Sequence, residues 1–360
     1  MRRPGSSSPP PPPRPAPPLL SPHLQLPHRQ QLPDVLGRYQ FKTHRVIPVQ
    51  VEADSGKGVW QVETDRGTVC LKRTGQPADR MAFSIAAQLH LAAHGAPVPR
   101  LIPARDGTFA VESAGQVYVV YQWISGRSVR WENRDDLQAS VEALARLHGA
   151  SRGFTVPAGV KVFTKLGRWP DHYAEMEERL QKWKVQAEQQ PEVRFHAHFL
   201  AGVDTALELA ARARAALATS PYDVLVQRTW PGDTLVHQDF GPSNIIMTGT
   251  GPYLLDLDTV TLEFPARNLR KLMGELMQSK GGWRSDIIDE VLGWYTKINP
   301  LAAEHLHLLG IDLMFPNVFH DSAKNWFKKN KPEKPDRMER ACRFEREKAD
   351  TLTVWLPKLR

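Results

Sequence analysis

The stretch LVHQDFGPSNIIMTGTGPYLLDLD, residues 235–258, places polar side chains next to short apolar runs. Its two apolar runs, residues 245–247 and 253–255, flank the turn sequence TGTGP. Short apolar runs on either side of a glycine-rich turn predict a β-hairpin. In the simplest register of this hairpin, residue 245 faces residue 255.

That register places Asn244 opposite Asp256, and Asp239 lies a few residues before the first strand. Directly opposed residues have Cβ atoms about 4.5–5.5 Å apart. Two carboxylates and an amide oxygen are hard ligands of the kind that Mg²⁺ prefers, with water and phosphate completing its shell. The sequence therefore predicts a magnesium-nucleotide site; the alternative is that these polar residues only cap loops.

The same spacing is typical of a kinase catalytic loop. In such a loop an Asp positions or deprotonates the attacking hydroxyl, an Asn follows five residues later, and a second Asp after a hairpin holds metal. Residues 237–244 read HQDFGPSN, and residues 256–258 read DLD. We therefore predict Asp239 as the catalytic residue and Asn244 and Asp256 as metal ligands.

A kinase-like site also needs a lysine for the nucleotide phosphates and a segment that contacts adenine. Lys72 ends the predicted strand TVCLK and is the candidate lysine, although a solvent-facing lysine at a strand end is the alternative. The segment YVVYQWISG is expected to join the two lobes. Backbone groups of Gln122, Trp123 and Ile124 would then contact adenine.

The order of predicted elements indicates an α+β fold with two lobes. Glycine-rich turns separate three predicted strands within residues 45–72, and a helix with apolar residues at helical spacing covers residues 78–94. Two further strands and then several helices follow. These strands are expected at residues 109–113 and 116–124, and the helices at 133–149, 172–190, 201–217 and within 266–360.

We accordingly divide the chain into a disordered tail at residues 1–33, a nucleotide-binding N-lobe at residues 34–124 and a helical C-lobe at residues 125–360. The tail contains twelve prolines and cannot bury enough apolar surface to become ordered. It also carries four of the basic residues and no acidic residue, so it accounts for half of the net charge of +8. A nucleic-acid partner is not expected, because the chain has no basic stripe with interleaved aromatics.

Composition also limits the cellular setting. No apolar run approaches the roughly 20 residues that cross a bilayer, and the first residues lack the apolar segment of a signal peptide. The two cysteines, Cys70 and Cys342, form no disulfide framework, which favours a reducing site of synthesis. We expect neither a membrane partner nor export.

The chain lacks the GxGxxG, DFG and APE motifs of protein kinases, and Gly241 stands where they carry a lysine near the catalytic Asp. It resembles the aminoglycoside phosphotransferase and choline kinase branch, whose substrates are usually small molecules. VHQDFGPSNII, LLDLDTVTLEFPARNLRKL, PRLIPARDG and YQWISGR closely resemble the CotS family of bacterial spore coat proteins. That resemblance extends from about residue 35 to the C-terminus.

The resemblance implies a two-lobed kinase-like fold, synthesis in the mother-cell cytoplasm of a sporulating bacterium, and assembly into the spore coat with other coat proteins. It also implies ATP and Mg²⁺ as cofactors and an unidentified hydroxyl compound or coat component as acceptor. By similarity Asp239 would be the catalytic base, Asn244 and Asp256 the metal ligands, and Lys72 the phosphate contact.

Two departures from the family pattern favour an alternative, a kinase-like scaffold with weak or no activity. No acid occurs between Asp79 and Asp106, so the helix lacks a partner for Lys72, and Gln88 or Leu89 lies about where the acid is expected. Asn268 replaces an Asp that would brace the catalytic loop, and an amide supplies no charge.

Overall fold

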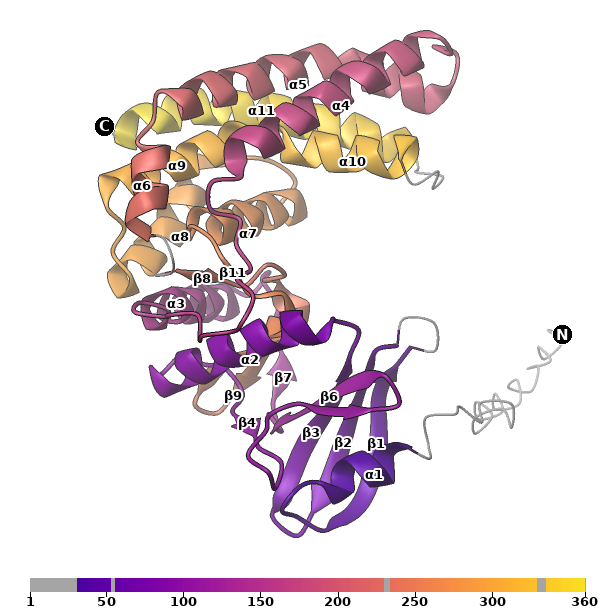
Figure 1. The fold of residues 1–360 in the computed structure, drawn as a ribbon. Coiled ribbons are helices and arrows are strands. Elements are labelled where there is room, and N and C mark those ends of the chain that lie inside the picture. Colours follow the sequence, from indigo (N-terminus) through magenta and orange to yellow (C-terminus); the bar gives the residue numbers. More distant parts are fainter. Residues whose placement is uncertain (1–30, 53–55, 230–233, 329–334, 360) are drawn as a thin grey trace, which may run out of the picture.

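The computed structural model describes residues 31–52, 56–229, 234–328 and 335–359, and it has two lobes (Figure 1). Residues 1–30 of the predicted tail lie outside the described residues. Residues 31–33 begin helix α1 (Gln31–Gly37), so these last three tail residues are helical instead. Their helix forms because Leu32, Val35 and Leu36 face the core of the first lobe.

The first lobe contains a twisted antiparallel sheet beside α1. Its strand order is β1-β2-β3-β6-β4, and β5 also pairs with β6. Alternate residues of β2 are buried, as expected for a strand with one face toward a core. The strands have the bounds β1 Thr43–Val51, β2 Gly58–Thr64, β3 Gly67–Thr74, β4 Leu101–Ile102, β5 Val111–Ser113 and β6 Gln116–Gln122.

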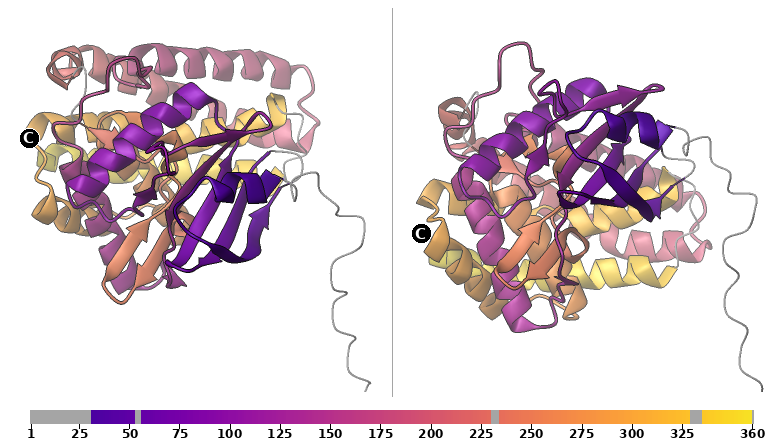
Figure 2. Two further views of the ribbon diagram at one scale, coloured as in Figure 1. Left: turned by 60° about the horizontal axis from the view of Figure 1, so that its bottom comes forward. Right: turned by 90° about the horizontal axis from the view of Figure 1, so that it is seen from below.

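Helix α2 (Ala78–Ala93) lies where this sheet meets the helical lobe, as the views in Figures 1 and 2 show. One part of α2 faces the sheet, because Met81 packs with Val119 and Tyr121 of β6. Phe83 and the buried residues one and two turns further along instead belong to the apolar core of the helical lobe. The helix is therefore shared between the cores of both lobes.

The connection between the lobes leaves β6 and forms β7 (Arg127–Ser128), which pairs with β9 (Ile245–Thr248). Gly126 is required at this crossing, because a Cβ there would lie 2.2 Å from the carbonyl oxygen of Met247. The connection is thus fixed against the strand that follows the predicted catalytic loop.

The predicted hairpin exists, but its register is wrong by one residue. Ile245 of β9 pairs with Leu254 of β10 (Gly251–Leu254), not with residue 255. The turn is tighter than expected, because Gly251 has a φ of 116° and the Thr248 hydroxyl donates to its carbonyl oxygen at 2.8 Å. Asn244 therefore does not face Asp256 across the ladder; its carbonyl oxygen accepts from the Leu255 amide at 2.8 Å.

The second lobe is mainly helical, with short strands beneath the helices. Strand β8 (Leu235–Val236) pairs with β11 (Thr261–Leu262) next to the catalytic loop. The helices have the bounds α3 Arg134–Ala150, α4 Trp169–Glu188, α5 Arg194–Ala218, α6 Tyr222–Thr229, α7 Ala266–Ser279, α8 Ser285–Ile298, α9 Ala303–Met314, α10 Asn317–Phe327 and α11 Pro335–Trp355.

The predicted α+β architecture, with an antiparallel sheet and a helix in the first lobe and a mainly helical second lobe, is confirmed by this arrangement. The predicted cap of α3 is also present, since the Asn133 side chain accepts from the amides of Asp135 and Asp136. Within the described ranges no helix is both long and apolar enough to cross a membrane.

Candidate active site

Lys72 joins the two lobes through a pair of carboxylates. Its Nζ lies 2.7 Å from Oδ1 of Asp256 and 2.8 Å from Oδ1 of Asp258. The lysine side chain is only 18% exposed, because β3 places it on the face of the sheet that turns toward the second lobe. Burial by itself would lower the Lys72 pKa, but Asp258 and Asp256 outweigh this effect and raise it.

Asp258 belongs to the predicted motif at residues 256–258, but the sequence prediction assigned it no role of its own. Its other oxygen, Oδ2, accepts from the Thr74 hydroxyl at 3.0 Å, so β3 holds this carboxylate with two side chains. Its backbone oxygen also accepts from Arg80 Nε at 3.1 Å. The signal was present in the DLD sequence, since a second acid lies two residues after Asp256.

Asp256 reaches Lys72 because the backbone turns sharply where β10 ends. Its φ of 59° and ψ of 58° are left-handed, a conformation that Asp tolerates better than most residues. A short 3₁₀ turn, Leu257–Thr259, follows at once. The positive φ, and not the predicted cross-strand pairing, therefore places this carboxylate. Lys72 holds the pKa of Asp256 below its usual value despite burial, which acts in the opposite direction.

Gln88 does not replace the missing acid of α2. Its Nε2 donates to the Ser84 hydroxyl at 3.0 Å, and that hydroxyl donates to the backbone oxygen of Leu257 at 2.8 Å. The two residues thus attach α2 to the turn between Asp256 and Asp258. Charge for Lys72 comes from Asp258 instead, so the lysine is oriented by the second lobe.

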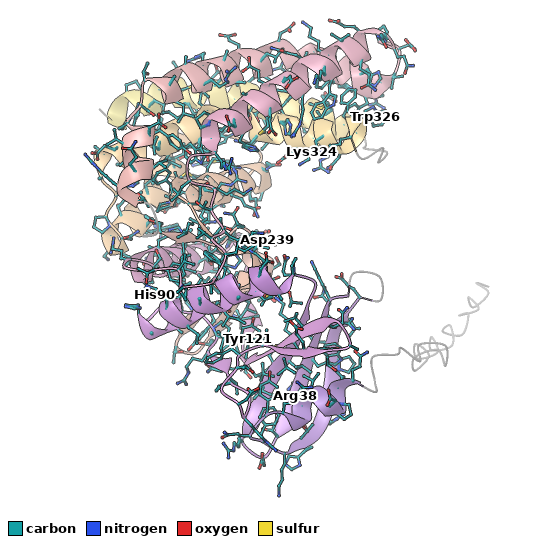
Figure 3. All side chains as sticks on the ribbon, viewed as in Figure 1. Arg38, His90, Tyr121, Asp239, Lys324 and Trp326 are labelled. Atoms are coloured by element: carbon teal, nitrogen blue, oxygen red, sulfur yellow. The ribbon has the colours of Figure 1, made fainter. Side chains whose placement is uncertain are left out.

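Asp239, the third residue of the catalytic loop, lies on the side of the second lobe that faces the first lobe (Figure 3). Its side chain is 69% exposed, and Oδ1 lies 2.8 Å from Lys271 Nζ of α7. Asn244 Nδ2 donates to the backbone oxygen of Asp239 at 2.8 Å and to its Oδ2 at 3.3 Å. The Lys271 contact is the main cause that holds the Asp239 pKa below its usual value.

Asn268 braces the catalytic loop in a way that an Asp could not. Its Oδ1 accepts from the His237 amide at 3.0 Å, and its Nδ2 donates to the His237 carbonyl oxygen. An ionised carboxylate has no donor for the second bond. Asn268 is 1% exposed, so both bonds lie away from solvent. The substitution noted in the sequence therefore supports the loop geometry.

Two histidines complete the brace. His237 Nε2 donates to the Leu255 carbonyl oxygen at 2.6 Å, and its Nδ1 accepts from the Asp239 amide at 3.2 Å. His148 of α3 donates from Nε2 to Oδ1 of Asn268 at 3.0 Å. Burial lowers the pKa of His148 to about 4, so this ring is neutral at pH 7. Each histidine bond thus fixes one tautomer.

The segment that joins the lobes, residues 118–126, uses one of its backbone donors within the first lobe. The Gln122 amide donates to the Arg100 carbonyl oxygen at 2.8 Å, and Gln122 also pairs with Val69 in the sheet. Its N–H is therefore not available for adenine. Trp123 and Ile124 follow the end of β6, and we find no backbone hydrogen bond for either within the described part of the chain.

The side-chain oxygens of Asn244 and Asp256 are of the kind that a hard divalent cation prefers. The amide nitrogen of Asn244 donates to Asp239, so its Oδ1 points away from Asp239. Asp256 contacts Lys72 through Oδ1, which leaves its Oδ2 for a cation. The structure brings Asn244 to Asp239 and Asp256 to Lys72; among the described residues no group of three or more His, Cys, Asp and Glu side chains is placed to hold a metal. Cation binding at Asn244 and Asp256 therefore stays a prediction.

The fold, with its antiparallel sheet, shared helix and mainly helical second lobe, defines the kinase-like class of proteins. The sequence profile of the Phosphotransferase enzyme family (APH) matches residues 49–281, and the chain belongs to this family. The chain is also 27% identical over 321 residues to spore coat protein S of Bacillus subtilis (strain 168), covering 85% of this chain and 87% of that protein. The predicted resemblance to spore coat proteins is confirmed.

Solved structures agree on the fold. An aminoglycoside phosphotransferase from Alicyclobacillus acidocaldarius subsp. acidocaldarius DSM 446 aligns with a TM-score of 0.71 at 16% identity, covering 90% of this chain and 93% of that one. An amicoumacin kinase in complex with AMP-PNP, Ca²⁺ and Ami aligns with a TM-score of 0.58 at 15% identity, again covering 90% and 93%.

Proposed function

We propose that this protein is a spore coat component that transfers the γ-phosphoryl group of ATP, with Mg²⁺, to a hydroxyl of a small molecule or coat component. The observation that carries the proposal is the contact of Lys72 with Asp256 and Asp258 across the two lobes. Lys72 and Asp256, which are 184 positions apart in sequence, meet where a kinase needs a phosphate-binding lysine beside a metal-binding carboxylate.

In the transfer step the acceptor oxygen forms a bond to the γ-phosphorus of ATP. The bond from that phosphorus to the β–γ bridging oxygen breaks, and its electron pair leaves with ADP. The hydroxyl proton passes to the Asp239 carboxylate and then to solvent. Lys271 keeps the Asp239 carboxylate ionised. This carboxylate therefore first accepts a hydrogen bond from the acceptor hydroxyl and holds the attacking oxygen in line with the γ-phosphorus.

The nucleotide would lie between β3 and the turn at Asp256. Lys72 would donate to its phosphates, and the backbone of Trp123 and Ile124 would contact the adenine edge. Asn244 and Asp256 would hold the divalent cation through their oxygens. When bound, this cation neutralises charge that develops on the transferred phosphoryl group.

The cellular setting follows from the relative among spore coat proteins. We propose synthesis in the mother-cell cytoplasm, assembly into the spore coat and contact with other coat proteins. The amicoumacin kinase is in complex with AMP-PNP and Ca²⁺, which supports a nucleotide and a divalent cation as ligands here.

A kinase-like scaffold in the coat is the second candidate function. It is favoured by Gln88, which lies on α2 where a kinase carries an acid and bonds Ser84 instead of Lys72. In such a scaffold the Lys72 ion pairs would serve only to join the lobes. Nucleotide binding separates the two candidates.

The test is thermal unfolding of the full chain with ATP and MgCl₂. Wild type should be stabilised by mass action, by about 2.7 kcal/mol at a ligand concentration of 100 Kd. Asp256→Asn should lose most of this shift, because Asn tolerates the left-handed backbone but lacks the charge. Asp204→Asn is the matched control, since Asp204 is an exposed acid on α5 that pairs with Lys184.

Transfer itself is tested with γ-labelled ATP and a coat extract. Asp239→Asn should keep the thermal shift and lose label incorporation. No shift for wild type, with or without MgCl₂, would reject the enzyme and leave the scaffold.

A further inference from the structure

A cavity of about 110 Å³ lies beside the catalytic loop. Gln238, the residue before Asp239, forms part of its wall. Lys271 links the two residues, because its Nζ contacts the Gln238 carbonyl oxygen at 3.3 Å and Asp239 Oδ1 at 2.8 Å. The cavity is smaller than the roughly 300–1,000 Å³ of pockets that enclose a drug-sized ligand, so it suits one end of an acceptor.

Three segments that are distant in sequence build the cavity. The chain before α4 runs alongside β11, because the Lys165 amide donates to the Leu262 carbonyl oxygen at 2.9 Å. That segment and the start of α4 contribute Lys165 and Arg168, and the start of α7 contributes Arg267. We find no ion pair for any of these cations among the residues that the structure describes.

The two acids of the cavity do not offset these cations. Asp312 is buried and already bound, since Oδ2 lies 3.2 Å from Arg270 Nε and Oδ1 accepts from the Tyr173 hydroxyl at 2.7 Å. Glu263 is buried under Trp169, and burial raises its pKa to about 7. At neutral pH this carboxyl is therefore only partly ionised, and the cavity has a net positive charge.

We propose that the phosphoryl acceptor is a small anionic hydroxyl compound, such as a sugar acid, whose carboxylate binds Lys165, Arg168 and Arg267. This inference rests on the proposed function, because it takes Asp239 as the residue that accepts the proton of the acceptor hydroxyl. A cationic aminoglycoside would place its ammonium groups against these side chains and would be repelled. The cavity thus selects against the compounds that give the phosphotransferase relatives their name.

A larger cavity, of about 440 Å³, is not a candidate acceptor site. It lies at the start of α3 and contains none of the candidate site residues. Its buried acid, Asp136, is already held by both terminal nitrogens of Arg127 at 2.6 and 2.7 Å.

The test uses three sugars that differ in charge, D-glucuronate, D-glucose and D-glucosamine, titrated calorimetrically into the full chain without nucleotide. We expect glucuronate to bind at least tenfold more tightly than glucose, and glucosamine to bind most weakly. Arg168→Gln should weaken glucuronate binding about tenfold, because it removes a charge-assisted bond. Arg179→Gln, further along α4 and paired with Glu175, is the matched control and should match wild type.

Four results would overturn the proposed anion site: equal binding of the three sugars, tightest binding of glucosamine, no detectable binding of glucuronate, or the same loss of glucuronate binding in both arginine variants. The proposed function fails separately, through the absence of an ATP and MgCl₂ shift, because the sugar titration contains no nucleotide. Glucuronate binding without such a shift would therefore retain the anion site and reject the transferase.

Discussion

The side-chain nitrogen of Lys271 lies 2.8 Å from the carboxylate of Asp239. The catalytic loop itself has Gly241 at the position where protein kinases carry a lysine. Helix α7 therefore supplies from 32 residues downstream the cation that the loop lacks. Its position ties the protonation state of Asp239 to a residue outside the motif.

We expect Lys271→Gln to shift the acid limb of the pH–rate profile for transfer to higher pH. Lys271 holds the Asp239 pKa down, and activity that needs the carboxylate is lost as pH falls through that pKa. Without the cation the pKa rises, so the loss begins at higher pH. Turnover at pH 7, where the carboxylate stays ionised, should fall about tenfold for a separate reason, the loss of the charge-assisted bond that positions Asp239. Lys271→Arg should retain the wild-type limb; an unshifted limb in Lys271→Gln would contradict the assignment.

We expect Asn268→Asp to lower the free energy of unfolding by about 1–3 kcal/mol at pH 7, because it leaves the buried His237 carbonyl oxygen without its donor. Urea unfolding monitored by tryptophan fluorescence measures this change. Asn325→Asp in α10 is the control, since we find no side-chain hydrogen bond for the half-buried Asn325 in the described part of the chain. Equal stability of the two variants would argue against a bracing role for Asn268.

Asp258→Asn should lower the free energy of unfolding by about 1–3 kcal/mol, because Lys72 keeps only Asp256 as a partner in a largely buried position. The stabilisation by ATP and MgCl₂ should also decrease, since Lys72 is no longer held by two carboxylates. Asp204→Asn, which breaks an exposed pair with Lys184, should cost less than about 1 kcal/mol. A cost for Asp258→Asn no larger than this would show that Lys72 does not depend on it.

Glu263 makes stability depend on pH near neutrality. Burial raises its pKa from 4.5 to about 7, so the folded protein binds a proton that the unfolded chain releases above pH 4.5. Stability from this group therefore falls as pH rises from about 4.5 to 7 and levels off above it. Glu263→Gln should remove this decline, which urea unfolding at pH 5 and pH 8 measures. A wild-type decline that persists in the variant would assign it to another group.

Local spacing in the sequence is what identifies Lys72, Asp239 and Asn244 as candidate site residues. Lys72 follows from its place at the end of a short strand, and Asp239 and Asn244 follow from their five-residue separation. The hairpin register was wrong because the turn closes through the Thr248 hydroxyl and the positive φ of Gly251, which an apolar pattern does not encode. Asp256 then reaches Lys72 through its own left-handed backbone.

The remaining site residues depend on contacts between distant segments. Lys271 and Asn268 lie on α7, and nothing in the loop motif specifies which face of that helix meets the loop. Backbone groups of Gln122 were expected to contact adenine, but β4 begins beside this residue and the Arg100 carbonyl oxygen accepts its N–H. Long-range packing of this kind is visible only when the chain is folded.

Arg80 of α2 donates to the backbone oxygens of Asp258 and Val260 and to the Thr261 hydroxyl, all in the second lobe. Together with Phe83 in the core of that lobe, it fastens α2 to the helical side of the molecule. A movement of the sheet relative to the second lobe would therefore leave α2 in place. It would bend the chain at three connections, residues 75–77, 94–100 and 123–126, and not only at the linker after β6.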